Sequence, residues 1–433
     1  MSGIKKIFFS VLLFGLLLST LPARADENGY NLEQAVKRAL VMNFSITSSE
    51  ANLNAAENWR KAVRGTFGPE LSTAYSYSDK QHLDNDNNYS WYFALRQELF
   101  SGFATLAAYQ KAALQKDNAE AQLAQARLNL ICDVQTNFFL YLKAEQNVRS
   151  AEDSLKRLEE QLKVTRSFYN VGLRPNLEVL QAEVNVSEAE DTLLRARNAL
   201  EIQRVRLNTL LILPIDVSPK YVGSLEYIPF LGNMEKCLEQ AYRMRPDVII
   251  ARKSVEISQK DATTAKSGYY PKVQAEGRWS TQGDNWKANG SENTPTRYSS
   301  WSLNLSGSYT IFEGGNTYYR VRQSRQLVNK VIAEEANLKQ EVIYQVQSRL
   351  LDLDNASKRI RVARTGVEQA SEAYRAATAR YMSQVGTSLD VMDAQAKLTA
   401  AEVALTGAQA DYMSALASLY AAIGQENPAL SAQ

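Results

Sequence analysis

The side chains that most often do chemistry are scarce in this chain of 433 residues. His82 is the only histidine and stands in a polar loop, so neither a Ser-His-Asp triad nor a zinc site can be built around it. No glycine-rich phosphate loop and no nucleophile elbow is present. We therefore expect no enzyme, no metal site and no cofactor.

Two cysteines, Cys132 and Cys237, are the only thiols. They do not form a CxxC pair, and each falls inside a different helical pattern. An exported protein could join them in a disulfide. The separate helical patterns favour two free, buried thiols instead.

The first 25 residues have the order of a secretory signal peptide. Lys5 and Lys6 precede an apolar run over 7–18, and Ala-Arg-Ala at 23–25 forms a small-x-small cleavage site. An uncleaved anchor is the alternative, but the run is short for crossing a bilayer. No cysteine follows the cleavage site, so we expect no lipid anchor.

Charge and hydropathy narrow the class further. Removing residues 1–25 takes away three basic side chains and leaves 46 Lys and Arg against 47 Asp and Glu, with no basic stripe, so we expect no nucleic-acid partner. No later apolar run approaches the ~20 residues of a transmembrane helix. If the chain enters a membrane, it does so as a closed β-barrel.

The chain is an internal duplication. Residues 31–69 align without a gap to 233–271, and Leu-Phe-Ser-Gly at 99–102 matches Ile-Phe-Glu-Gly at 311–314. The predicted organisation is a first repeat over 26–213, a linker over 214–232, a second repeat over 233–424 and a tail over 425–433.

Each repeat reads as helix, two strands, very long helix and closing helix. The first helix begins near Leu32 and must end before Pro69, and its twin before Pro271. The long helices are predicted over about 103–169 and 316–381, and ~67 residues at ~1.5 Å each span roughly 100 Å. Helices of that length predict a coiled coil or a tunnel rather than a globule.

The closing helices, predicted over about 177–212 and 389–423, carry a seam at alternating spacings of three and four. In the second repeat its first members are Val391, Ala394, Leu398, Ala401 and Leu405. A 3.5-residue period predicts left-handed coiled-coil packing, although an ordinary helical bundle uses the same period.

Four segments alternate apolar and polar residues at period two, over about 71–79, 90–99, 273–281 and 299–312. This alternation is typical of transmembrane β-strands with their apolar face in lipid, but a soluble sheet with one buried face alternates identically. Small serines and opposed charges on the polar face favour a wet lumen. Four strands cannot close a barrel, so the membrane interpretation requires several copies, whose number these patterns do not set. The polar loops at 80–89 and 282–298 would lie in water.

The whole mature chain resembles the TolC-like outer-membrane factor family. The resemblance rests on the duplication, Pro69 and Pro271, the two strand exits and the stretch from Tyr381 to Gln395. It implies a mainly α protein with a small β-barrel, built as a homotrimer with a 12-stranded barrel in outer-membrane lipid and a 12-helix tunnel in the periplasm. It also implies an equatorial belt near 214–245, where three of the chain's prolines cluster.

Family resemblance also implies function and partners. Such channels accept small molecules or proteins from an inner-membrane transporter of the RND, ABC or MFS class, through a periplasmic adaptor protein, in a tripartite efflux or type I secretion system. The absence of a lipid-anchor cysteine favours the type I secretion branch, because many drug- and metal-efflux relatives are lipoproteins. The alternative from another class is a non-conducting periplasmic or surface coiled-coil protein, structural or adaptor. An adaptor would show one helical hairpin rather than two, and no lipid-facing strands.

The resemblance assigns a gate to the turns between the long helices. Asp390 and Asp393 match the family's tip aspartates, and Glu178 holds the related position in the first repeat; copies of these would form acidic rings that favour cations. The same stretch reads as a helix start whose cap and early acids contribute ~0.3–1 kcal/mol each, and both roles are compatible. Tyr381 matches a tip-tethering tyrosine, and Arg174 is the candidate for its missing arginine partner.

Overall fold

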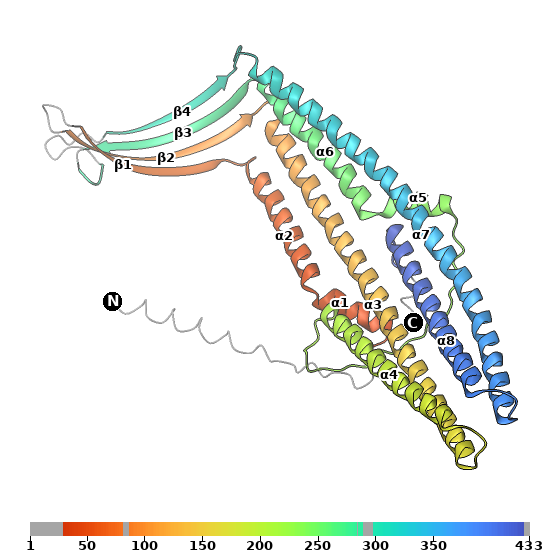
Figure 1. The fold of residues 1–433 in the computed structure, drawn as a ribbon. Coiled ribbons are helices and arrows are strands. Elements are labelled where there is room, and N and C mark those ends of the chain that lie inside the picture. The colour runs from red at the N-terminus through yellow and green to blue at the C-terminus, as the bar shows by residue number, and fades with distance from the viewer. Residues whose placement is uncertain (1–28, 81–85, 284, 289–297, 428–433) are drawn as a thin grey trace, which may run out of the picture.

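The computed structural model describes residues 29–80, 86–283, 285–288 and 298–427, and it is strongly elongated (Figure 1). A sheet lies at one end, and long helices run away from it to two turns at the other end. The predicted signal peptide and most of the two predicted strand loops lie outside the described residues.

The helix expected at the start of each repeat is two helices, which corrects the sequence prediction. In the first repeat α1 (Leu32–Met42) and α2 (Phe44–Gly65) are separated by Asn43, whose backbone is extended. The Asn43 side chain caps α2 by accepting a hydrogen bond from the Ser45 N–H at 2.9 Å. In the second repeat α5 (Met234–Met244) and α6 (Pro246–Lys266) are separated by Arg245. Pro246 cannot continue the hydrogen bonds of α5, so it begins a new helix instead.

Four long helices form two antiparallel hairpins. The first hairpin is α3 (Ala104–Asn170) with α4 (Asn176–Leu210), and the second is α7 (Asn316–Met382) with α8 (Ser388–Ala422). The 67 residues of α3 span about 100 Å. On α8, the seam residues Val391, Leu398 and Leu419 are buried, as the 3.5-residue period predicts. Within the described residues, no helix combines the length and apolar character needed to cross a bilayer.

The sheet contains β1 (Glu70–Lys80), β2 (Asp86–Phe100), β3 (Lys272–Gly283) and β4 (Tyr298–Ser308). Its order is β1-β2-β3-β4 with every neighbour antiparallel, so the two repeats join at β2 and β3, and β1 and β4 are the edges. The fourth strand ends at Ser308, earlier than the predicted 312, which leaves Tyr309 and Ile311 outside the strand.

The strand register places the apolar residues of all four strands on one face. Phe93 of β2 lies opposite Trp279 of β3, and Trp279 lies opposite Trp301 of β4. This face is open, because Trp301 is 80% and Leu303 74% exposed.

The other face of the sheet is polar and internally paired. Arg96 contacts Glu276 at 3.0 Å, and the guanidinium of Arg278 lies 3.8 Å from the centre of the Tyr92 ring. Water on this side and apolar surroundings on the other suit the two faces of a barrel wall.

The main core lies midway along the helices, where α1, α5 and the linker 211–233 wrap around them; we call this region the collar. Its largest fully buried side chains include Phe138, Tyr221, Tyr412 and Leu416. The Tyr412 hydroxyl donates to the Ile228 carbonyl of the linker at 2.5 Å. Both cysteines are free; Cys237 is buried, whereas Cys132 is only half-buried.

Candidate functional site

Two turns at the end of the molecule far from the sheet join the helices of each hairpin (Figure 1). α3 ends with Gly172 at φ +74°, and the Leu173 N–H donates to the Phe168 carbonyl at 2.9 Å. α7 ends in the same way, with Gln384 at φ +62° and the Val385 N–H donating to the Arg380 carbonyl at 3.0 Å. A left-handed residue that closes the last helical turn is the usual way to stop a helix sharply. The repeats therefore present equivalent tips.

Tyr381 ties the second hairpin to the first at these tips. Its side chain is fully buried, its hydroxyl lies 3.0 Å from the Thr165 hydroxyl of α3, and its ring centre is 5.6 Å from that of Phe168. Burial raises the pKa of Tyr381 above its ordinary value, so the hydroxyl stays protonated and able to donate. Tyr381 at the end of α7 therefore contacts α3 of the first hairpin within one chain.

Arg174 completes the connection from the turn of the first hairpin. Its Nη2 donates to the Gly386 carbonyl at 2.7 Å, its Cζ lies 5.1 Å from the centre of the Tyr381 ring, and its Nη1 is 3.4 Å from Glu178. The Tyr381 hydroxyl also donates to Glu178 at 3.5 Å. The side chains of Arg174 and Glu178 are only 16% and 15% exposed. We call Thr165, Arg174, Glu178, Tyr381 and Gly386 the tip cluster.

The two aspartates of the predicted gate lie apart from Glu178, in water. Asp390 forms a capping box with Thr387, accepting from its N–H at 3.0 Å while its own N–H donates to the Thr387 hydroxyl at 3.2 Å. The bond from the Thr387 N–H lowers the pKa of Asp390 below its ordinary value. Asp393 pairs with Lys397 at 2.7 Å and is 61% exposed.

The three acids predicted as one set therefore have two different environments. The charge of Glu178 is compensated inside the tip cluster, whereas the aspartates are open to ions in solution. Glu178 differs from the aspartates because two turns that are far apart in the sequence lie close together in space. The spacing of residues within either turn does not reveal this proximity.

Between the tips and the collar, the hairpins meet through polar and small side chains. Ser154 of α3 lies 3.3 Å from the Gln395 amide and 3.2 Å from the Thr399 hydroxyl of α8, and the Asn185 amide contacts the Met392 sulfur at 2.8 Å. A groove of about 380 Å³ runs beside these contacts. Its apolar lining includes Ala151, Leu158, Ala189, Ala396 and Val403.

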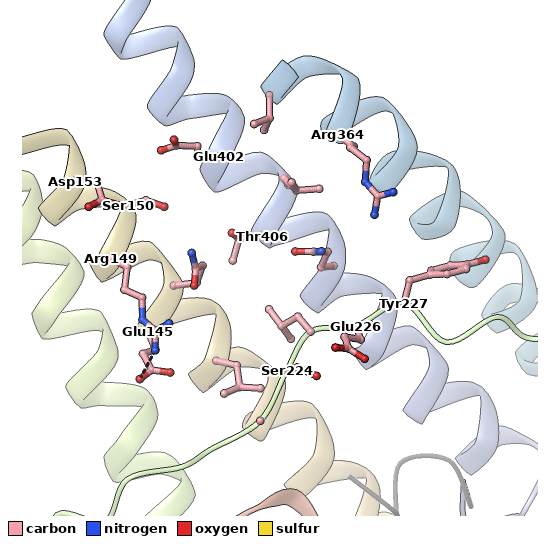
Figure 2. A pocket seen from close by; sticks show the side chains of 17 residues that line it. Glu145, Arg149, Ser150, Asp153, Ser224, Glu226, Tyr227, Arg364, Glu402 and Thr406 are labelled. Carbon is pink, nitrogen blue, oxygen red and sulfur yellow. Dashed lines mark ion pairs between the residues drawn. The ribbon is translucent and has the colours of Figure 1, made fainter. Parts of the chain in front are cut away.

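A larger hollow of about 600 Å³ lies where the linker crosses the hairpins, and sequence reasoning did not find it (Figure 2). Its walls come from α3, α7, α8 and residues 223–227. The lining mixes both signs of charge: Arg149 pairs with Glu145 at 3.2 Å, while Glu402 pairs with nearby Arg157 at 3.3 Å. No group of three metal-binding side chains occurs in the described part of the chain. The hollow is thus a gap between the hairpins with a lining of mixed charge.

A four-stranded sheet with an exposed apolar face, mounted on two hairpins whose longer helices span about 100 Å, defines a protomer of a channel-tunnel rather than an enzyme. The chain belongs to the outer membrane efflux protein family, whose model matches residues 35–211 and 237–425. It is therefore an outer-membrane channel component of efflux or secretion, and its helical part extends into the periplasm.

Individual relatives agree with this assignment along nearly the whole chain. The chain is 23% identical to the outer membrane protein TolC of Vibrio cholerae, covering 91% of this chain and 90% of the relative. It is 22% identical to the alkaline protease secretion protein AprF of Pseudomonas aeruginosa, covering 94% and 86%. Among solved structures, CusC superposes with a TM-score of 0.81 at 16% identity, covering 91% of this chain and 92% of that one.

Proposed function

We propose that three copies of this chain form an outer-membrane export channel, with a 12-stranded barrel continued by a 12-helix periplasmic tunnel. The observation that carries the proposal is the sheet. Its apolar face is exposed, and β1 and β4 each leave one edge without a partner strand among the described residues. Four strands are about half the practical minimum for a barrel, so neighbouring copies must supply the rest.

Mass and conductance test this proposal together. The purified protein, extracted in detergent, should have the mass of three chains by native mass spectrometry and should give unitary conductance steps in a planar bilayer. A monomer without conductance under any voltage or salt condition would refute the channel and favour the non-conducting coiled-coil alternative.

The partners that we infer are a periplasmic adaptor and an inner-membrane transporter of the RND, ABC or MFS class. The groove beside the Ser154 contacts supports a helical adaptor, because a long apolar groove between helices fits the apolar stripe of another helix. AprF is named for the secretion of a protease, so proteins are candidate cargo alongside small molecules.

Site-specific photo-crosslinking tests the adaptor groove. A photoreactive residue at Ala396, inside the groove, should capture the adaptor in cells. The matched control is Leu351 on α7, which is 61% exposed and does not line the groove. Equal capture at both positions, or capture only at Leu351, would contradict the assignment.

We further infer that the tips form the gate. The tip cluster would hold the two hairpins of each protomer together in the closed state, and opening would need the hairpins to separate when partners bind. Asp390 and Asp393, repeated around a threefold axis, would form two acidic rings that select and bind cations.

Divalent and trivalent cations applied from the periplasmic side test the rings. Asp390→Asn with Asp393→Asn should relieve cation block and reduce cation preference, because amides keep the side-chain shape but lose the charge. Asp354→Asn on α7 is the control, since Asp354 forms a comparable i,i+4 pair with Lys358 at 2.6 Å, away from the tips. Unchanged block in the double variant would show that the aspartates only cap and pair within α8.

A further inference from the structure

A basic hollow lies where the second repeat passes from strand to helix. Its volume is about 370 Å³, and it is lined by Tyr269, Tyr318, Val321, Arg322, Arg325 and Gln326. Both tyrosines are about half exposed, at 46% and 54%. We call this hollow the junction pocket.

The charge of the junction pocket is uncompensated. Neither Arg322 nor Arg325 has a carboxylate within ion-pair distance among the described residues, and no acidic side chain lines the pocket. Some other exposed arginines of the long helices do pair along their own helix, as Arg375 does with Glu372 at 2.7 Å. Two unpaired guanidinium groups beside each other repel, so the site favours an anion. A planar guanidinium fork fits phosphate oxygens well.

The position of the pocket relates it to the membrane. Tyr269 ends the short helix η1 (Ser267–Tyr269), just before β3 begins, and Tyr318 stands in the first turn of α7 after β4. The exposed apolar face of the sheet starts at this level. Tyrosine and arginine at the end of an apolar band are the side chains that meet lipid headgroups.

The pocket also faces outwards from the proposed tunnel. Tyr318 and Arg325 are separated from Lys339 by whole heptads, so all three share one face of α7. The transverse helix α5 contacts α7 on that face, where the Tyr242 hydroxyl donates to the Lys339 carbonyl at 3.4 Å. A helix laid across the lumen would block transport, so this face is the outer one.

We propose that the junction pocket binds the phosphate of an anionic phospholipid in the periplasmic leaflet of the outer membrane. Arg322 and Arg325 would hold the phosphate oxygens, the tyrosine rings would flank the glycerol region, and the acyl chains would follow the apolar face of the sheet. The proposal rests on the proposed function, because it requires that face to lie in lipid.

Lipid retention by the detergent-purified oligomer tests the pocket. The oligomer is stripped of lipid, incubated with phosphatidylglycerol or with phosphatidylcholine in mixed micelles, and analysed by native mass spectrometry. Arg322→Gln with Arg325→Gln should weaken phosphatidylglycerol binding about thirtyfold, since two basic side chains near the lipid are removed. Arg320→Gln is the matched control, because Arg320 is on the same turn but does not line the pocket. Replacement of both pocket arginines by lysine keeps the charge without the fork and should give an intermediate loss.

The outcomes distinguish a phospholipid in the junction pocket from free phosphate. Equal binding of both lipids by the wild-type oligomer, or equal phosphatidylglycerol binding by the wild type and the double glutamine variant, would overturn the pocket. If inorganic phosphate displaces bound phosphatidylglycerol as fully as added lipid does, the ligand of the pocket is free phosphate and not a membrane phospholipid. Planar-bilayer conductance of the same preparation reports on the channel alone, so its absence would refute the proposed function without altering the measured lipid preference.

Discussion

Replacing Arg174 by glutamine should release the two hairpins from each other at the tip. The variant removes the charged donor to the Gly386 carbonyl and the cation over the Tyr381 ring. It also leaves the Glu178 carboxylate, 15% exposed, with the Tyr381 hydroxyl as its remaining partner in the tip cluster. Glutamine is chosen because it keeps most of the aliphatic stem and removes only the guanidinium.

The expected cost follows from these contacts. A hydrogen bond from a charged group contributes about 1.5–3 kcal/mol, and a cation–π contact about 0.5–1 kcal/mol. These terms are not additive, so the local free energy of opening should fall by about 2–4 kcal/mol, which corresponds to a roughly 30- to 900-fold increase in the open population.

Hydrogen exchange measures this local opening directly. Amides of 165–178 and 381–392 should lose protection in Arg174→Gln, while amides of the collar around Phe138 and Tyr412 keep theirs. Arg375→Gln is the control, since the Arg375–Glu372 pair is 78% and 67% exposed and such pairs contribute little. Protection of both turns that matches the wild type, or an equal loss in Arg375→Gln, would show that Arg174 does not hold the tips together.

Three further predictions concern the collar, the start of α8 and the thiols. Gly424→Ala should lower the melting temperature of the oligomer by several degrees, because the φ of Gly424 is +78° and a Cβ there would lie 2.7 Å from the backbone of the α5 C-cap. Gly366→Ala is the control: Gly366 has open space around it, so the added methyl group should stabilise α7 by about 0.5–1 kcal/mol. The pKa of Asp390 is lowered, so its ionised carboxylate stabilises the first turn of α8 at pH values above 3.8, the ordinary pKa of aspartate. This contribution is lost as pH falls through the lower folded-state pKa. The protection factors of amides 388–392, taken relative to the intrinsic exchange rate at each pH, should therefore fall in acid in the wild type but not in Asp390→Asn. Burial raises the pKa of both Cys132 and Cys237, so maleimide at neutral pH should label them slowly in the native protein and rapidly in denaturant; rapid native labelling of both would contradict this.

The regular parts of the fold could be predicted because one physical pattern governs each. The seam through Val391 and Leu398 predicts which face of the closing helix packs against its neighbours, and the alternation around Phe93 and Trp279 predicts which face of each strand is apolar. Proline at 246 is a residue that can start a new helix, but the helical pattern continues on both sides of it, so the sequence pattern predicted one helix there. The break at Asn43 depends also on a tertiary contact, the bond from its amide to the Leu210 carbonyl at 3.1 Å.

The sequence predicted where the residues of the candidate site lie along the chain, but not which of them contact one another. Resemblance located Arg174, Glu178 and Tyr381 at the turns, but only the three-dimensional structure places the Arg174 guanidinium between Gly386 and Glu178. Helix-start chemistry did anticipate the capping box of Asp390, because a cap and its third residue lie within one turn. Contacts within one turn are encoded locally, whereas contacts between two turns depend on how two hairpins pack, whose longer helices span about 100 Å.

The unequal strength of the collar and the tips suits a gate that opens at one end only. In the collar, fully buried side chains such as Phe138, Tyr221 and Leu416 each contribute about 1.5–3 kcal/mol, and many of them act together. At the tips, the hairpins are joined by a few polar contacts of about 0.5–3 kcal/mol each. Reversing a closed-to-open ratio of 99:1 takes about 5.5 kcal/mol, and a partner that binds the open form alone supplies this when its local concentration is about 10⁴ times its Kd. Such a partner can therefore separate the tips while the collar remains folded and acts as the pivot.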